Sequence, residues 1–285
     1  MNVGPGKETS FEYNGSKVAD YFDQYGEKDW NRMVQTPVEE VSLHLHSHYL
    51  QKYLPLGTRV LEIGAGAGRF TQVLAGLGAR ILAADISPYQ LELNRRHAQQ
   101  LGFAAAVEDW LVIDICDLGR FAEASFEAVV AYGGPFSYAF DRRQEALQEC
   151  VRVLQPGGWL FLSVMSLWGS AHRALPGVLE VPPDTNQEIT SSGDLSPTKM
   201  PQRPGPPLHM FRAGELVDWL GKAGLAVQAV SASGCLAGGW AESLVKVRAD
   251  PLQWQELLRM ELEASAEPGA WDMGTHIIAV VQKGK

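Results

Sequence analysis

The sequence predicts an α/β fold with a mostly parallel sheet that helices cover on both faces. Short apolar segments typical of strands alternate with helical segments from residue 59 to residue 164, as in successive βαβ units. The strand segments are nearly continuous apolar runs, which is expected of strands buried on both faces. A glycine-rich stretch, residues 64–68, follows the first strand and marks a sharp turn into a helix.

Five strands and three helices make up this core. The strands are expected at residues 59–63, 80–84, 110–113, 126–132 and 159–164. The helices are expected at residues 70–77, 87–101 and 142–154, the second beginning with Ser87-Pro88 as its cap and first turn. Toward the C-terminus the alternation resumes with two helices (213–223 and 251–264) and two strands (226–231 and 275–282).

Two segments lie outside this alternation. Residues 1–56 are expected to form an N-terminal helical cap, in which Thr36-Pro37 begins a helix. Residues 166–212 hold eight of the chain's 16 prolines and interrupt the core. A loop of that length inside a compact domain is typical of a lid, so we predict a lid insertion within a domain that spans residues 57–285.

Composition narrows the possible partners and the location. With 24 Lys+Arg against 33 Asp+Glu, the formal net charge is −9, which argues against nucleic acid as a partner. Three widely spaced cysteines without a CxxC pair predict neither a disulfide framework nor a metal site. The start lacks the pattern of a secretory signal, and no run of about 18 apolar residues predicts a membrane span. We therefore expect a cytoplasmic protein.

The glycine-rich turn is the main functional signal. Its N–H groups at the start of a helix favour an anionic or electron-rich ligand group. A dinucleotide fingerprint, GxGxxG, would need glycine at position 69, where Arg69 stands. A P-loop is excluded because no Gly-Lys-Ser/Thr follows. The pattern is instead GxGxG, with the acidic Glu62 two positions before the first glycine.

Four further motifs follow this turn at ordered spacings. Asp85 closes the second strand, and residues 112–115, 126–132 and 154–160 provide the others. Together the five motifs resemble those of the class I S-adenosylmethionine-dependent methyltransferases, of the small-molecule, type 11 kind. The resemblance implies a Rossmann-like, doubly wound sheet of seven strands in the order 3-2-1-4-5-7-6, with the last strand antiparallel. It also implies S-adenosylmethionine as the cofactor.

The resemblance assigns cofactor contacts to particular positions. Asp85 would accept hydrogen bonds from the ribose hydroxyls, and Asp114 would accept one from the adenine amino group, although Asp109 and Asp117 lie close by. Cap aromatics could close over the cofactor or belong to the core. The expected cofactor-binding residues are Glu62, Gly64, Ala65, Gly66, Gly68, Asp85, Ile86, Asp114, Ile115, Tyr132, Tyr21, Tyr25 and Trp30.

The resemblance implies methyl transfer to oxygen, nitrogen or carbon of a small-molecule acceptor. Methyl transfer depends chiefly on alignment, so no catalytic motif is required. One alternative is an RNA- or protein-directed methyltransferase, with a basic groove formed by Arg142, Arg143, Arg152, Lys199 and Arg203. Another is a non-catalytic S-adenosylmethionine-binding regulator. Residues 132–136 lack the Asn/Asp-Pro-Pro-Tyr/Phe motif associated with methylation of planar amides and nucleobase amines.

Candidates for catalysis and acceptor binding come from the cap and the lid. His209 is the first candidate for a general base and His172 the second. The expected substrate-binding residues are Phe136, Tyr138, Trp168, Arg212 and His48. His44 and His48 would share one helix face, but no acid completes a metal site there, so no metal is expected. We expect no nucleic acid or membrane partner, and a monomer or homodimer.

Overall fold

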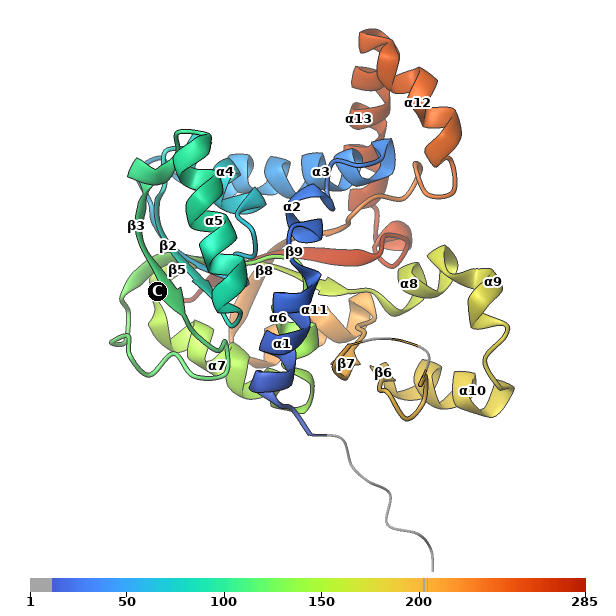
Figure 1. The fold of residues 1–285 in the computed structure, drawn as a ribbon, viewed down its shortest axis with the longest axis horizontal. Coiled ribbons are helices and arrows are strands. Elements are labelled where there is room, and N and C mark those ends of the chain that lie inside the picture. The colour runs from blue at the N-terminus through green and yellow to red at the C-terminus, as the bar shows by residue number, and fades with distance from the viewer. Residues whose placement is uncertain (1–11, 202, 204) are drawn as a thin grey trace, which may run out of the picture.

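The computed structural model describes residues 12–201, 203 and 205–285, so the first eleven positions of the cap lie outside it. Its centre is a seven-stranded sheet in the order β3-β2-β1-β4-β5-β9-β8 (Figure 1). β1 pairs in parallel with β2 and β4, whereas β9 runs antiparallel to β5 and β8. The predicted fold class and strand order are confirmed. The strands are β1 (Arg59–Ile63), β2 (Arg80–Asp85), β3 (Val107–Val112), β4 (Phe126–Ala131), β5 (Leu154–Met165), β8 (Leu225–Ala232) and β9 (His276–Lys283).

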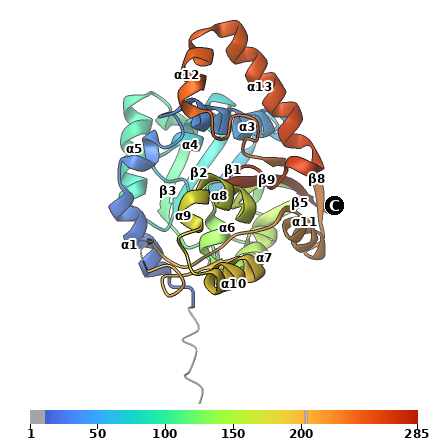
Figure 2. The same cartoon turned by 90° about the vertical axis from the view of Figure 1, so that its right-hand side faces the viewer.

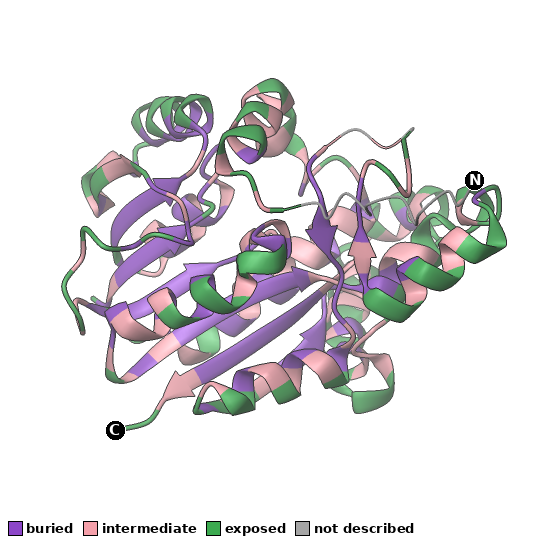
Figure 3. Ribbon diagram, turned by 90° about the horizontal axis from the view of Figure 1, so that it is seen from below, coloured by how far each residue is buried: buried purple, intermediate pink, exposed green. Residues whose placement is uncertain are grey.

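Helices cover both faces of the sheet because successive residues of a strand point to opposite faces, and the residues on both faces are apolar. Val60 of β1 belongs to one core with Leu45 and Leu74, while Leu61 belongs to the opposite core with Leu147. Figure 3 shows the sheet as a buried layer between helices with exposed outer faces. The helices are α3 (Pro37–Tyr53), α4 (Arg69–Gly76), α5 (Pro88–Gln100), α6 (Pro135–Tyr138), α7 (Arg143–Val153), α11 (Ala213–Lys222), α12 (Ala241–Ala249) and α13 (Pro251–Ala266).

Two strands extend beyond their predicted bounds. β3 begins at Val107, three residues earlier than expected. β5 begins at Leu154 and so includes the Pro-Gly-Gly stretch at residues 156–158, which we expected to precede the strand. The β4–β5 ladder shifts register between Phe126 and Ala128. A bulge accommodates extra residues without ending the strand, and this explains the difference.

The cap contains α1 (Gly15–Tyr25) and α2 (Lys28–Asn31) before α3. The Asn14 side chain accepts a hydrogen bond from the N–H of Lys17 and so caps α1. α3 begins as predicted at Thr36-Pro37, and Thr36 and Glu39 form a reciprocal capping box. Figures 1 and 2 show α1 alongside α5, at the end of the sheet where the parallel strands finish.

The lid has more regular structure than its composition suggests. Its described residues form three helices and a two-stranded sheet: α8 (Leu167–Arg173), α9 (Leu175–Val178), α10 (Pro183–Ser192), β6 (Asp194–Leu195) and β7 (Leu208–His209). A small apolar cluster that includes Leu167, Ile189 and Leu208 holds these elements together, and Tyr138 of α6 packs against it. The lid therefore has a core of its own next to α6 (Figure 2).

Candidate functional site

The turn between β1 and α4 adopts a backbone conformation that requires glycine. Gly64, Gly66 and Gly68 have φ values of +70°, +51° and +101°, which residues with a Cβ rarely adopt. The space above the turn is also filled: a Cβ at Gly64 would lie 2.6 Å from Cγ of Pro135. A Cβ at Gly66 would overlap the carboxylate of Asp29 from the cap. The glycine pattern thus lets the cap and α6 approach the turn closely.

We expect alanine at position 66 to destabilise the protein. A left-handed conformation costs a residue with a Cβ about 1–2 kcal/mol, and the overlap with Asp29 adds to that cost. Gly66→Ala should therefore lower the free energy of unfolding in urea by about 2 kcal/mol or more. Gly76→Ala in α4 is the control, because a Cβ there meets no atom within 4 Å. Equal stability of the two variants would contradict this account of the turn.

Asp85 joins the turn to the end of β2. One carboxylate oxygen accepts a hydrogen bond from the N–H of Gly66 at 2.8 Å, and the other accepts from the N–H of Ser87 at 2.8 Å. The side chain is buried, and burial raises the pKa of Asp85 to about 6, although both hydrogen bonds oppose this. A buried carboxylate at the edge of a pocket is suited to accept hydrogen bonds from a bound ligand.

Glu62 is buried behind the turn and does not line the pocket. Its carboxylate accepts a hydrogen bond from Thr71 Oγ1 at 2.7 Å, and Asn94 donates to the same hydroxyl at 2.8 Å. Trp110 in turn donates to the Asn94 side chain. Burial raises the pKa of Glu62 to about 8. This network holds the turn against α5 and β3.

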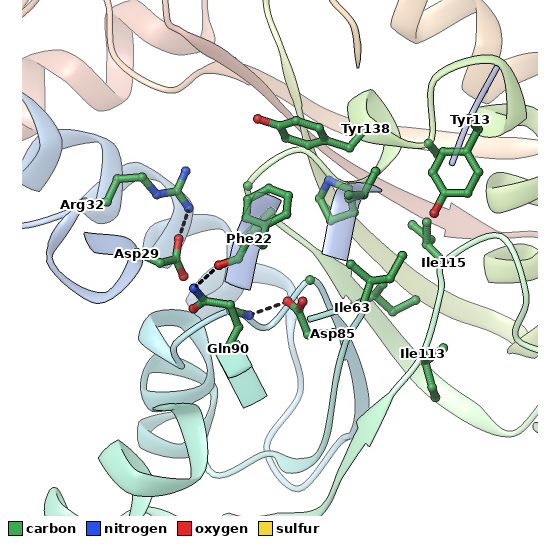
Figure 4. A pocket seen from close by; sticks show the side chains of 18 residues that line it. Tyr13, Phe22, Asp29, Arg32, Ile63, Asp85, Gln90, Ile113, Ile115 and Tyr138 are labelled. Carbon is green, nitrogen blue, oxygen red and sulfur yellow. Dashed lines mark hydrogen bonds and ion pairs between the residues drawn. The ribbon is translucent and has the colours of Figure 1, made fainter. Parts of the chain in front are cut away.

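A pocket lies between the turn, the cap and the ends of β2 and β4 (Figure 4). It contains about 650 Å³ of empty space, a figure that includes the open solvent at its mouth. Its lining includes Ile63, Gly64, Gly66, Asp85, Ile86, Gln90, Ile113 and Ile115 from the core. The cap and the segment after β4 contribute Tyr13, Val18, Phe22, Asp29, Arg32, Tyr132, Gly133, Pro135, Tyr138 and Ala139.

Two buried polar atoms of this pocket have no partner. Among the described residues, Arg32 Nε and Gln90 Oε1 are the only buried side-chain nitrogen or oxygen atoms without a hydrogen bond. Both residues line the pocket, Arg32 beside Asp29 and Gln90 beside Asp85 (Figure 4). Buried polar atoms are normally hydrogen-bonded, so a donor and an acceptor in one pocket indicate a polar ligand.

Residues 61–162 match the family model described as a methyltransferase domain. This match covers about a third of the chain, and the fold is that of the class I methyltransferases. The motif spacing and the strand order agree with this class, which uses S-adenosylmethionine. A ubiquinone biosynthesis O-methyltransferase of Xanthomonas axonopodis pv. citri (strain 306) is 32% identical over 112 residues, which are 39% of this chain and 45% of that protein. The chain thus spans less than half of this curated relative's length.

Solved structures resemble the whole chain in fold. The cyclase SpnF has a TM-score of 0.62 at 17% identity, and the alignment covers 96% of this chain and 97% of SpnF. A Burkholderia thailandensis 1,6-didemethyltoxoflavin-N1-methyltransferase, solved with its substrate and S-adenosylhomocysteine, has a TM-score of 0.56 at 17% identity, with 94% and 85% covered. At such identities the similarity establishes the fold alone.

The methyltransferase domain brings several of the predicted cofactor residues together. Gly64, Gly66, Asp85, Ile86, Ile115 and Tyr132 all line the pocket. Asp114 accepts from the N–H of Cys116 at 2.8 Å and is hydrogen-bonded to the hydroxyl of Tyr13. Ala65 and Gly68 belong to the turn, where the N–H of Gly68 donates to Ala65. Glu62 lies behind it, as described.

The three aromatic residues predicted in the cap are placed differently from one another. The ring centres of Tyr21 and Tyr25 lie 6.2 Å apart within an aromatic cluster. Phe22, which stands between them in the chain and which the sequence did not single out, lines the pocket. Trp30 is held between the guanidinium of Arg69, 3.7 Å from its ring, and the imidazole of His97 at 4.1 Å. Trp30 therefore anchors α2 to the outside of the turn, and we no longer assign it to the cofactor.

The predicted acceptor residues are dispersed. Tyr138 lines the pocket, whereas Phe136 is fully buried in the core against Trp219. Trp168 is exposed on α8, with the Arg212 guanidinium 5.8 Å from its ring centre. His48 packs against Tyr49 on α3. Only Tyr138 of this set lies at the pocket, so we withdraw the acceptor assignment of the other four.

His209 is unsuited to act as the general base we expected. It is buried, and its Nδ1 lies 2.7 Å from Asp194 Oδ1 while its Nε2 lies 2.8 Å from Glu215 Oε1. Although burial opposes the charge, the hydrogen bonds to both carboxylates raise the pKa of His209. An imidazolium with both N–H groups engaged has no free lone pair to accept a proton. His209 instead ties β6 and β7 of the lid to α11 of the core. The second candidate, His172, is exposed on α8.

The clamp around His209 predicts a pH-dependent contribution to stability. Because the pKa is raised on folding, the contribution is complete below the unfolded pKa near 6.5 and is lost as pH rises through the folded value. His209→Asn should cost about 1.5–3 kcal/mol at pH 6, and the difference from the wild type should shrink toward pH 9. Arg143, the other charge that faces the ring, lowers the pKa of His209 and so limits the pH range in which the imidazole stays charged. A constant difference across the range, measured by urea unfolding, would show that His209 carries no charge.

Four pocket residues with polar side chains were not predicted from the sequence: Tyr13, Asp29, Arg32 and Gln90. Asp29 accepts from the N–H of Ala67 at 3.0 Å and forms an ion pair with Arg32 at 3.3 Å. The charged pair three residues apart in a short segment was the available signal, but it is equally typical of an exposed helix face.

In the described part of the chain, no group of three or more His, Cys, Asp or Glu side chains converges in a way that could hold a metal ion. Within the same residues, no helix combines the length and the apolar character needed to cross a bilayer.

Proposed function

We propose that this protein transfers a methyl group from S-adenosylmethionine to oxygen, nitrogen or carbon of a small-molecule acceptor. The observation that carries the proposal is the position of two unpartnered polar atoms, Arg32 Nε and Gln90 Oε1, in one pocket with Asp85 and the glycine turn. A buried polar atom left without a partner costs about 1–3 kcal/mol. S-adenosylmethionine carries a carboxylate, two ribose hydroxyls and an adenine that match the groups along this pocket.

The lining suggests how the cofactor lies. Ile113, Ile115 and Tyr13 form an apolar end that suits the adenine ring, and Asp85 at the centre suits the ribose (Figure 4). Arg32 occupies the other end, where its guanidinium would pair with the carboxylate of the methionine part. When bound, the cofactor supplies a methyl group on a positively charged sulfur. The protein's part is to fix this methyl group and exclude water.

The acceptor would approach from the side of Tyr138 and the glycines after β4. The space above Gly133 is narrow, since a Cβ there would lie 3.3 Å from Arg32 Nη2. Tyr138 lines this part of the pocket and packs against the lid's apolar cluster. A site covered by the cap, with Tyr138 packed against the lid, suits a small, enclosed acceptor better than a polymer. The similarity to an O-methyltransferase of ubiquinone biosynthesis supports the same class of acceptor.

The basic groove that an RNA-directed enzyme would need is largely engaged in internal contacts. Arg142 pairs with Glu145 at 2.5 Å, and Arg152 pairs with Glu149 at 2.7 Å. The other three basic residues donate to backbone carbonyl groups: Arg143, Lys199 and Arg203. Since phosphate binding requires free cationic side chains, these contacts favour the small-molecule proposal.

Methyl transfer from labelled S-adenosylmethionine tests the proposal. A cell extract is separated into small-molecule and macromolecular fractions, and each is incubated with the protein and the labelled cofactor. We expect label in the small-molecule fraction and formation of S-adenosylhomocysteine that depends on that fraction. Label in RNA or protein alone would support the polymer-directed alternative. Tight cofactor binding with no transfer to either fraction would support a regulator.

A further inference from the structure

A long loop joins β6 to β7 in the lid, and its base is fixed to the core. We call this loop the strap; it spans residues 196–207, of which 202 and 204 lie outside the described residues. At its base, Asp194 pairs with His209 in the two-stranded sheet, and the His209 ring is hydrogen-bonded to Asp194 and to Glu215 of α11. The ends of the strap are therefore held in place, while its middle extends toward the cap (Figure 2).

The strap contacts the cap at Tyr21 of α1. Gly205 has a φ of +118°, and a Cβ at this position would lie 3.0, 3.2 and 3.4 Å from three atoms of the Tyr21 ring. So close an approach is possible because glycine has no Cβ. Met200, earlier in the strap, packs against the apolar cluster of the lid. The Tyr21 ring thus joins the cap to the lid.

The same ring packs against the wall of the pocket. The centre of the Tyr21 ring lies 6.4 Å from that of Tyr138 and 5.2 Å from that of Phe22. The rings of Phe22 and Tyr138 pack edge to face at 5.1 Å, and both line the pocket (Figure 4), whereas Tyr21 does not. A continuous series of rings therefore leads from the side of the pocket where the acceptor would approach to the strap.

The contact between the cap and the strap consists of ring packing. Among the described residues, no hydrogen bond or ion pair connects residues 12–36 with the strap. Aromatic contacts shift an equilibrium by only about 2–10-fold each. Contacts of that strength keep a closed form in excess and still let it open often, as a gate requires. The fixed base keeps the strap in position to close again.

We propose that the strap and Tyr21 form a gate, which opens to admit the acceptor and to release S-adenosylhomocysteine. The proposal rests on the proposed function, since it takes these molecules as the ones that pass. Tyr21 packs on the strap, on Phe22 of the cap and on Tyr138 of α6, so these three segments separate when the gate opens. While the gate is closed, it keeps water away from the methyl group.

Binding rates test the gate, because a contact that is equally present in the free and the bound protein changes the rates and not the affinity. Surface plasmon resonance gives the association and dissociation rates of S-adenosylhomocysteine. Tyr21→Ala removes the contacts with Tyr138 and with the strap, so both rates should rise by at least about fourfold, about twofold for each contact. The dissociation constant should stay nearly unchanged. Tyr21→Phe keeps the ring and should behave as the wild type.

A second variant tests the contact from the side of the strap. Gly205→Ala places a Cβ against the Tyr21 ring and should also raise both rates. In the Tyr21→Ala background its effect should be at least about threefold smaller, because groups in contact have non-additive effects. Gly177→Ala in α9 is the control, since a Cβ there meets no atom within 4 Å. Urea unfolding verifies that each variant is folded.

The possible failures are distinguishable. Wild-type rates in Tyr21→Ala, or additive effects in the double variant, would overturn the gate. A faster dissociation alone, with weaker affinity, would assign Tyr21 to the ligand site and overturn the gate as well. Failure of the wild type to bind S-adenosylhomocysteine would instead overturn the proposed function. Hydrogen exchange then tests the contact without a ligand: Tyr21→Ala should speed the exchange of α1 and of the strap together, and unchanged exchange would overturn the contact.

Discussion

Replacing Asp85 by alanine is expected to weaken S-adenosylhomocysteine binding by about 10²–10⁴-fold, because two hydrogen bonds to a charged group are lost at about 1.5–3 kcal/mol each. Asp85 is buried and lines the pocket beside the turn. Glu92→Ala, on an exposed position of α5, is the matched control and should leave the affinity unchanged. Calorimetry gives both dissociation constants.

The pH dependence of binding provides an independent test of Asp85. Burial raises its pKa to about 6 in the free protein, and hydroxyl donors favour the ionised form. The proton must leave on binding below that pH, so the dissociation constant should rise by up to about tenfold per pH unit below 6. The wild type should show this loss between pH 7.5 and pH 5. If Asp85→Ala showed the same pH dependence, another group would be responsible.

The second large effect concerns Arg32. Arg32→Met is expected to weaken S-adenosylhomocysteine binding by about 30–1,000-fold, the usual effect of removing one partner of a buried ion pair. Binding of methylthioadenosine, which lacks the amino-acid part, should hardly change. Lys28→Met, at an exposed position of α2, the short helix that Arg32 follows, is the control.

The contrast between the two ligands is the decisive part of this experiment. Arg32→Met also breaks the ion pair with Asp29, so a loss through the cap would weaken both ligands equally. Equal losses would therefore assign Arg32 to the structure of the cap. A loss confined to S-adenosylhomocysteine would assign it to the carboxylate.

The core of the fold was predictable because its signals are local. Each parallel strand is a short apolar run, and the turn at residues 64–68 contains the glycines that its positive φ values require. Asp85 was predictable for the same reason, since its position at the end of β2 follows from strand spacing alone. The carboxyl ends of neighbouring parallel strands meet at one edge, so these residues converge without any knowledge of the loops.

The residues that close the pocket were not predictable in this way. Arg32 directly follows α2 and Gln90 lies in α5, and no spacing rule connects the cap to the turn. Each of them has a buried polar atom without a hydrogen-bond partner, and this can be recognised only in the three-dimensional structure. His209 shows the opposite error: its position at the end of the lid suggested a base, but two carboxylates engage both of its nitrogens.

Calorimetric titration of the wild-type protein with S-adenosylhomocysteine, and separately with NADH, addresses the central claim most directly. The glycine spacing, the carboxylate that ends β2 and the two unpartnered atoms all predict one-to-one binding of the sulfur compound and no detectable heat with NADH. Saturable uptake of NADH, with no response to S-adenosylhomocysteine at the same concentrations, would contradict the account.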